Sequence, residues 1–146
     1  MHRPEGIAYE WRGNFDNREV NALHAEAFGH PILQDDWNAQ LQRHSLGWVS
    51  AREGDQLVGF VNVPWDGGVH AFILDTIVAA SAHGQGIGRR LIAIAVSQAR
   101  AARCEWLHVD FEDDLRDFYF DTCGFTPTNG GLIALAGESA VRPSAL

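Results

Sequence analysis

The chain has 146 residues, the length of one domain, and its 46% hydrophobic and 21% charged residues are ordinary for a globular protein. Its 11 basic and 19 acidic residues leave a net charge of −8, which argues against a nucleic-acid binder. No apolar run approaches the roughly 20 residues of a membrane-spanning helix, no signal peptide is apparent, and two cysteines are too few for a disulfide framework. We expect a single cytoplasmic domain over residues 1–146, with a loose tail after Gly137. It is expected to bind neither nucleic acid nor membranes and to be a monomer or a homodimer.

Apolar residues recur at helical spacing in two segments near the N-terminus, and strand-like patterns surround them. Asp16 can cap the first helix, and Pro31 ends it because proline lacks the N–H that a helix needs. The turn Glu53-Gly54-Asp55 predicts a hairpin. The elements predicted for this half are a strand Ile7–Arg12, helices Asn17–Phe28 and Asp35–His44, and strands Leu46–Arg52 and Gln56–Trp65.

The nearly continuous apolar run from Val69 to Val78 predicts a central strand that is covered on both faces. A glycine-rich stretch follows it and leads into an amphipathic helix. The remaining predicted elements are the helix Ile87–Arg103, a strand Trp106–Phe111, a helix Asp113–Thr122 and a closing pair of short strands, Phe125–Thr128 and Leu132–Leu135. The order β-α-α-β-β-β-α-β-α-β-β predicts an α/β (α+β) fold whose central mixed, mostly antiparallel sheet is flanked by helices.

The loop after this central strand carries glycines at positions 84, 86 and 88 and opens a long helix. The first N–H groups of a helix lack partners, and the helix dipole adds positive charge there. Glycines let a bulky anion approach the backbone. Arg89 and Arg90 oppose the dipole, which makes more sense if a bound polyphosphate supplies negative charge. The loop therefore predicts a phosphate cradle, and the alternative is a tight turn with solvated arginines.

Two nucleotide-binding motifs do not fit this loop. A Walker loop requires Gly-Lys-Ser/Thr after its glycines, and the chain contains no lysine. A dinucleotide fingerprint requires Gly-x-Gly-x-x-Gly, but Arg89 follows the pair Gly84 and Gly86, and Leu91 follows the pair Gly86 and Gly88.

The loop His83-Gly84-Gln85-Gly86-Ile87-Gly88 resembles the Gln/Arg-x-x-Gly-x-Gly/Ala signature of the GNAT N-acetyltransferases. Asp75-Thr76-Ile77-Val78 is similar to the acidic-then-apolar fourth strand of that family, and Phe118 to Phe125 is similar to its Tyr-x-x-x-Gly-Phe helix end. The order of elements matches over roughly Ile7 to Leu135. The resemblance implies an N-acetyltransferase that uses acetyl-CoA and no metal, and that moves the acetyl group directly to a small-molecule amine in a ternary complex. The alternative is a non-catalytic acyl-CoA-binding or interaction domain on the same scaffold.

The resemblance also implies which residues hold acetyl-CoA. Backbone N–H groups from Gln85 to Arg89 are expected to bind the pyrophosphate, and the strand edge at Ile77 and Val78 is expected to pair with the pantetheine arm. The N–H of Thr76 is the expected donor to the thioester carbonyl. The other predicted cofactor-binding residues are His83, Gly84, Gly86, Ile87, Gly88 and Asp113.

The resemblance makes Tyr119 the expected general acid for the departing thiolate. Four residues separate Tyr119 from Gly124, whereas the family pattern has three. Either the helix ends with a wider turn and Tyr119 faces the thiol, or Phe120 takes the tyrosine position and the general-acid role is absent. Cys104 and Cys123 are expected to be small buried hydrophobic residues and not nucleophiles.

A base must also accept the proton of an ammonium substrate. The candidates on the central strands are Asp75, His108, Asp110 and Glu112, of which Asp75 matches an acidic position of the family. The acidic run from Asp110 to Asp117 suggests a site for a cationic acceptor in which Asp110 and Asp114 take part. Its alternative role is to stabilise a helix N-terminus.

Overall fold

The computed structural model describes residues 6–136, so the predicted loose tail after Gly137 lies outside the described residues. In chain order the elements are β1 (Ile7–Trp11), α1 (Asn17–Phe28), α2 (Trp37–His44), β2 (Ser45–Glu53), β3 (Gln56–Pro64), β4 (His70–Phe72), β5 (Leu74–Val78), the 3₁₀ turn η1 (Ala80–Ala82), α3 (Ile87–Ala101), β6 (Trp106–His108), the 3₁₀ turn η2 (Asp113–Leu115) and the π-helical segment η3 (Asp117–Thr122).

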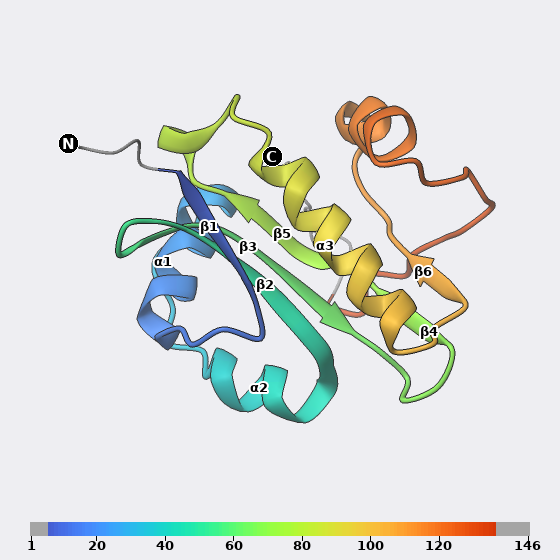
Figure 1. Ribbon diagram of the computed structural model, residues 1–146, viewed down its shortest axis with the longest axis horizontal. Helices are drawn as coiled ribbons and strands as arrows, with labels where there is room; N and C mark the ends of the chain where they lie inside the picture. Colours follow the sequence, from blue (N-terminus) through green and yellow to red (C-terminus); the bar gives the residue numbers. More distant parts are fainter. Residues whose placement is uncertain (1–5, 137–146) are drawn as a thin grey trace.

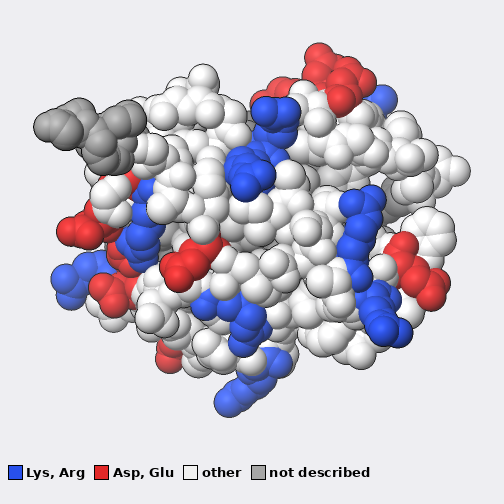
Figure 2. Space-filling view, viewed as in Figure 1, with Lys and Arg blue, Asp and Glu red and all other residues white. Residues whose placement is uncertain are grey.

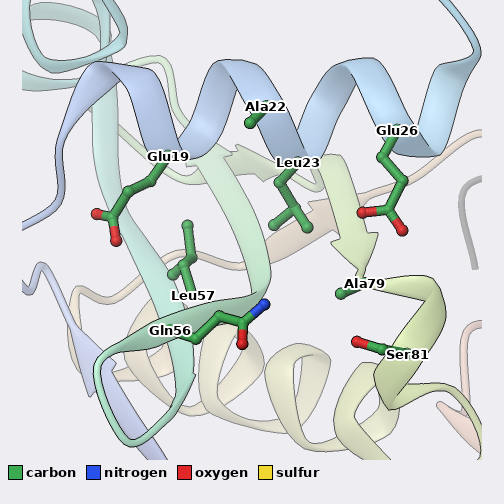
Figure 3. Close-up of a pocket in the computed structure, with 8 residues that line it drawn as sticks. All are labelled: Glu19, Ala22, Leu23, Glu26, Gln56, Leu57, Ala79 and Ser81. Carbon is green, nitrogen blue, oxygen red and sulfur yellow. The ribbon is translucent and has the colours of Figure 1, made fainter.

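The sheet confirms the predicted mixed α/β fold. Four strands lie in the order β1-β2-β3-β5, all antiparallel to their neighbours, while β4 and β6 pair in parallel as a separate ribbon. Helix α3 crosses one face of the large sheet, and α1 covers the opposite face with α2 packed beside it (Figures 1 and 3). The core fills both interfaces, so the sheet is covered on both sides.

The first helix begins and ends where the sequence predicts, and the second ends there. Asp16 and Glu19 form a capping box at the start of α1, and Gly29 ends the helix in the left-handed conformation with φ +68°. Helix α2 begins at Trp37, two residues later than predicted, because Asp36 is its N-cap and accepts a hydrogen bond from the Ala39 N–H at 3.0 Å.

The predicted central strand from Val69 to Val78 is in fact two strands that break at Ile73. The Ile73 N–H donates to the carbonyl of His108 at 2.8 Å, and from Leu74 onward the chain pairs with β3 instead. Asp75 adopts φ +55°, a conformation that L side chains rarely take. In the described chain, β5 therefore has one edge without a strand partner.

The C-terminal part differs most from the prediction. Strand β6 ends at His108 instead of Phe111, and the predicted helix Asp113–Thr122 is divided into η2 and η3. The closing strands predicted at 125–128 and 132–135 are wrong, since no residue from 125 to 136 is in a strand. Pro127 removes a backbone donor there, and Ile133 is 85% exposed, so no packing stabilises a hairpin.

Helix α3 packs closely on β3 because Gly59 has no side chain. A Cβ atom at Gly59 would lie 2.9 Å from Ile87 Cγ2 and 3.3 Å from Leu91 Cδ1, both of which are buried on α3. This contact fixes how closely the helix that begins at the glycine loop lies on the sheet.

We expect Gly59→Val to lower the free energy of unfolding by about 1–3 kcal/mol, since the added methyl groups overpack this interface. Urea denaturation followed by circular dichroism measures the change. Gly130→Val is the matched control because a Cβ there meets nothing within 4 Å. Equal stability of the two variants would contradict the close packing of α3 on β3.

Candidate active site

The glycine loop has the geometry of an anion cradle. Gly84 and Gly86 have φ values of +83° and +76°, and a Cβ at either position would meet no atom within 4 Å. Among residues 6–136, no side chain caps the N-terminus of α3, and no acidic residue lies in its first turn. Exposed Arg89 and Arg90 place positive charge at this end of α3 (Figure 2). The first N–H groups of the helix are thus free of any side-chain cap.

His83 closes the loop onto the preceding strand. Its Nε2 lies 2.9 Å from the carbonyl oxygen of Val78, and a carbonyl can only accept, so Nε2 carries the proton and donates it. The neutral ring then presents only a lone pair at Nδ1. His83 therefore positions the loop, and donors for an anion come from the backbone that follows it.

The strand before the loop brings the predicted residues Thr76, Ile77 and Val78 to the edge that has no strand partner. All three are buried. The hydroxyl of Thr76 is also buried and has no hydrogen-bond partner among the described residues. Buried polar atoms are normally paired, so an unpaired one beside an open strand edge indicates a place for a ligand group.

Asp75 stands directly before this edge and both of its carboxylate oxygens face polar side chains. Asn62 of β3 donates from Nδ2 to Oδ2 at 3.5 Å, and Nε2 of His24 on α1 lies 3.7 Å from Oδ1. Ser45 donates to the amide oxygen of Asn62 at 2.5 Å, which turns the amide nitrogen toward Asp75. The carboxylate is 23% exposed and can therefore be reached from solvent.

The C-terminal helix resolves the spacing of Tyr119. It ends as a π-helix, in which the Cys123 N–H donates to the Phe118 carbonyl at 2.9 Å, five residues earlier. A π turn holds one more residue than an α turn and so absorbs the extra residue before Gly124. Tyr119 is buried, and its ring stacks on Phe111 at 4.7 Å. The wider turn that the sequence left as one of two alternatives is the one that forms.

Phe120, the other candidate for the tyrosine position, lies in a different environment. Its ring is half-buried and lies beneath the Arg116 guanidinium at 5.1 Å from the ring centre. It is one residue along the π turn from Tyr119 and so points in another direction. Whether Tyr119 faces a bound thiol remains a prediction.

Both cysteines are free and half-buried. Burial raises the pKa of the Cys123 thiol to about 11, although the nearby charge of Arg89 opposes the shift. Burial also raises the pKa of Cys104. The thiolate is the nucleophilic form of cysteine, so neither side chain is activated for attack.

The acidic run lies on the surface where the chain leaves β6. Asp110, Glu112, Asp113, Asp114 and Asp117 are all exposed. No side chain caps η2, and Asp113 and Asp114 form its first turn, where acidic residues are favourable. Both the acceptor-site and the helix-capping interpretations therefore remain open.

Sequence reasoning missed two pairs of histidines. His24 Nδ1 lies 2.7 Å from His30 Nε2, and His70 Nδ1 lies 2.8 Å from His108 Nε2. The first pair spans the C-terminal end of α1, and only its six-residue separation around a helix end could have signalled it. The second pair lies on the outer face of the β4–β6 ribbon, where Phe72 stacks on His108.

A hollow of about 270 Å³ lies between α1, the start of β3 and η1 (Figure 3). None of the predicted site residues lines it. Its two carboxylates are already engaged: Glu19 pairs with Arg52 at 2.7 Å, and Glu26 accepts the Ala80 N–H at 3.0 Å. The hollow is therefore not assigned to the reaction.

The described residues 6–136 contain neither a membrane-spanning helix nor a group of metal-binding side chains. No helix in this range is both long and apolar enough to cross a membrane. Within the same range, no three histidine, cysteine or acidic side chains are grouped as a metal ion would require.

Solved structures similar to this one are acetyltransferases. A GNAT-family acetyltransferase of Streptococcus pneumoniae is 23% identical, with a TM-score of 0.70 over 89% of this chain and 99% of its own. An aminoglycoside acetyltransferase from an uncultured soil metagenomic sample is 16% identical, with a TM-score of 0.68 over 88% of this chain and 93% of its own. AAC(6')-Iy, solved with a CoA-containing bisubstrate analog, is 18% identical, with a TM-score of 0.69 over 88% and 97%.

No curated protein matches the chain. Residues 10–125, which contain every predicted site residue, match the family described as "Acetyltransferase (GNAT) family". The chain therefore belongs to the GNAT family of acetyltransferases.

Proposed function

We propose that the protein transfers the acetyl group of acetyl-CoA to the amine of a small cationic acceptor, by direct attack while both substrates are bound. The observation that carries this proposal is the uncapped N-terminus of α3, with its glycine loop, placed directly after the open edge of β5. GNAT enzymes use acetyl-CoA, and one structural neighbour was solved with a CoA-containing analog.

The residues at this position suit acetyl-CoA. Backbone N–H groups from Gln85 to Arg89 would hold its pyrophosphate, because Gly84 and Gly86 leave open space around the loop. The free edge at Ile77 and Val78 would pair with the amide groups of the pantetheine arm, as an added strand does. Asp113, at the start of η2, is proposed to help hold the same ligand.

Acetyl-CoA supplies an acetyl thioester, whose carbonyl carbon gains a bond to the amine nitrogen while its C–S bond breaks. An amine that arrives as an ammonium ion must first lose one proton, and the nitrogen loses a second as the amide forms. One of these protons ends on the CoA sulfur and the other enters solvent. Transfer therefore needs one group that accepts protons and one that donates to sulfur.

The side chains around the β5 edge can take these roles. Asp75 is proposed as the base, because its partly exposed carboxylate adjoins the edge and is held by Asn62. The Thr76 N–H is proposed to stabilise the charge on the carbonyl oxygen, since it follows the left-handed residue Asp75. Tyr119 is proposed to protonate the leaving sulfur. Neither cysteine thiol is activated, so neither is proposed as a nucleophile that would form an acyl-enzyme.

A cationic acceptor is supported by charge and by exposed rings. The acidic run from Asp110 to Asp117 begins two residues after His108, which contacts Phe72 close to Asp75. On the same face of the β4–β6 ribbon, Phe72 and Trp106 are 37% and 62% exposed, and a cation can bind against such rings. Clefts lined by one sign of charge concentrate ligands of the opposite sign.

The first prediction here concerns the cradle. Acetyl-CoA at ~100 times its dissociation constant should stabilise the protein by about 2.7 kcal/mol, which differential scanning fluorimetry detects. Gly86→Asp should abolish this shift, because it adds bulk and negative charge where the pyrophosphate binds. Gly54→Asp is the control, since Gly54 also has a positive φ and open space around it. A normal shift in Gly86→Asp would mean that the loop does not bind the pyrophosphate.

The second prediction concerns the general acid. Tyr119→Phe removes one oxygen and keeps the packing, so turnover should fall by roughly 10²- to 10⁴-fold while acetyl-CoA binds as before. Release of free thiol from acetyl-CoA measures turnover. The control is Tyr9→Phe, which makes the same change at the other tyrosine of the sequence. Parent-like turnover in Tyr119→Phe would assign the acid role elsewhere.

The third prediction concerns the acceptor. Over a panel of amines, cationic acceptors should give the highest kcat/KM, and their KM should rise with ionic strength because salt screens the acidic run. Asp114→Asn and Asp110→Asn should raise KM at low salt, whereas Asp55→Asn, in a distant turn, should not. If KM changes neither with salt nor with these substitutions, the acidic run does not bind the acceptor and serves to stabilise the helix N-terminus.

A further inference from the structure

The carboxylate of Asp75 is the first member of a row of polar groups that leads away from the β5 edge. Its Oδ1 lies 3.7 Å from Nε2 of His24 on α1. Nδ1 of His24 lies 2.7 Å from Nε2 of His30, in the segment that follows α1. Nδ1 of His30 in turn lies 2.6 Å from the carbonyl oxygen of Pro31. Two imidazoles thus connect a proposed catalytic carboxylate to a loop at the surface.

The hydrogen-bond partners fix where the protons are. The Pro31 carbonyl can only accept, so Nδ1 of His30 carries a proton. In a neutral ring, Nε2 of His30 is then an acceptor, and Nδ1 of His24 must donate to it. Each neutral ring carries one N–H proton, and these two hydrogen bonds account for both of them. Nε2 of His24 therefore carries a lone pair, which faces the carboxylate of Asp75.

The distances agree with this proton count. The two contacts that must contain a proton are 2.7 and 2.6 Å long, well within hydrogen-bond range. The contact between His24 and Asp75 is 3.7 Å, beyond that range, as expected for two acceptors that face each other. The one nitrogen of the two rings that can take up a proton, Nε2 of His24, therefore lies next to Asp75, the proposed acceptor of the amine's proton.

We propose that His24 and His30 form a proton relay that carries the proton received by Asp75 out to solvent. This inference rests on the proposed function, in which Asp75 accepts a proton from the ammonium form of the acceptor. The proton moves from the carboxyl of Asp75 to Nε2 of His24, which passes its Nδ1 proton to Nε2 of His30. His30 then releases its own Nδ1 proton to water, and each ring is left with its proton on Nε2. Both side chains are partly exposed, so proton exchange with water restores the starting tautomers before the next turnover. Asp75 returns to its charged form, and one proton has left the site.

The surroundings hold the two rings in register and leave an exit. The His24 ring contacts the rings of Phe28 and Trp37, with centres 4.4 and 5.4 Å away, so it cannot turn freely. Gly29 and Pro31, on either side of His30, are exposed. In the described chain, Asp75 of β5 is the sole charged group within ion-pair distance of His24, since Asn62 of β3 and Trp37 of α2 carry no charge. Asp75 is thus the one acid that exchanges protons with the relay.

Because His24 and His30 act through Asp75, they are positioning residues, and their test needs a measurement that a structural role would leave unchanged. The variants are His24→Gln and His30→Gln, with His44→Gln, an exposed histidine at the end of α2, as the control. In His24→Gln we expect kcat to fall roughly 10- to 100-fold with the acetyl-CoA dissociation constant unchanged. The lost rate should return in proportion to the concentration of added imidazole, whereas the parent and His44→Gln should ignore it.

Two results would overturn the relay: parent-like kcat in both His24→Gln and His30→Gln, or a loss of kcat in folded protein that imidazole does not restore. If His24→Gln fails to fold, as judged by circular dichroism, His30→Gln decides, because its side chain lies in an exposed segment. Asp75→Asn separates the two proposals. An inactive Asp75→Asn beside fully active histidine variants removes the relay alone, and a fully active Asp75→Asn removes the proposed base and the relay together.

Discussion

The point at which the chain leaves β6 and begins β5 determines the rest of this structure. The Ile73 N–H still bonds to the carbonyl of His108, yet from Leu74 onward the chain pairs with β3 alone. One apolar run therefore supplies a strand to each of two sheets, and the second of these strands, β5, keeps an unpaired edge in the described chain. An unpaired edge within a folded domain is unfavourable unless something covers it, and the glycine loop and the uncapped start of α3 follow it directly. The backbone thus presents donors and acceptors that suit the extended, phosphorylated ligand proposed above.

The left-handed conformation of Asp75 follows from the same separation. The register between β3 and β5 shifts between Phe60 and Asn62, opposite the strained residue, so the chain turns a polar side chain away from the core at this point. The Asp75 carboxylate contacts Asn62 of β3 and His24 of α1. The proposed base is thereby placed beside the strand edge, next to the two histidines proposed to connect it to the surface. The strain and the polar network have one common explanation in the chemistry proposed for this edge.

The sequence predicted the parts of the molecule that depend on local interactions. Helix α1 has the predicted bounds because Asp16 and Gly29 are strong start and stop signals. The loop from His83 to Gly88 was recognisable because its glycines lie between an apolar strand and an amphipathic helix. The break at Ile73 could not be predicted, because an apolar run has the same pattern whether it forms one strand or two strands with different partners. The final hairpin was predicted wrongly because apolar residues such as Ile133 suggest burial, and no neighbour buries them. The His24–His30 contact was missed, because only its six-residue separation around the end of α1 could have signalled it.

The central claim is that acetyl-CoA lies along the open edge of β5 with its pyrophosphate at the start of α3. A crystal structure of the protein with CoA tests this claim most directly. The account predicts hydrogen bonds from the backbone of Gln85 to Arg89 to the pyrophosphate, and pairing of the pantetheine amides with Ile77 and Val78. It also predicts that the sulfur lies beside Tyr119 and Asp75. CoA bound at any other surface, with the β5 edge empty, would contradict it.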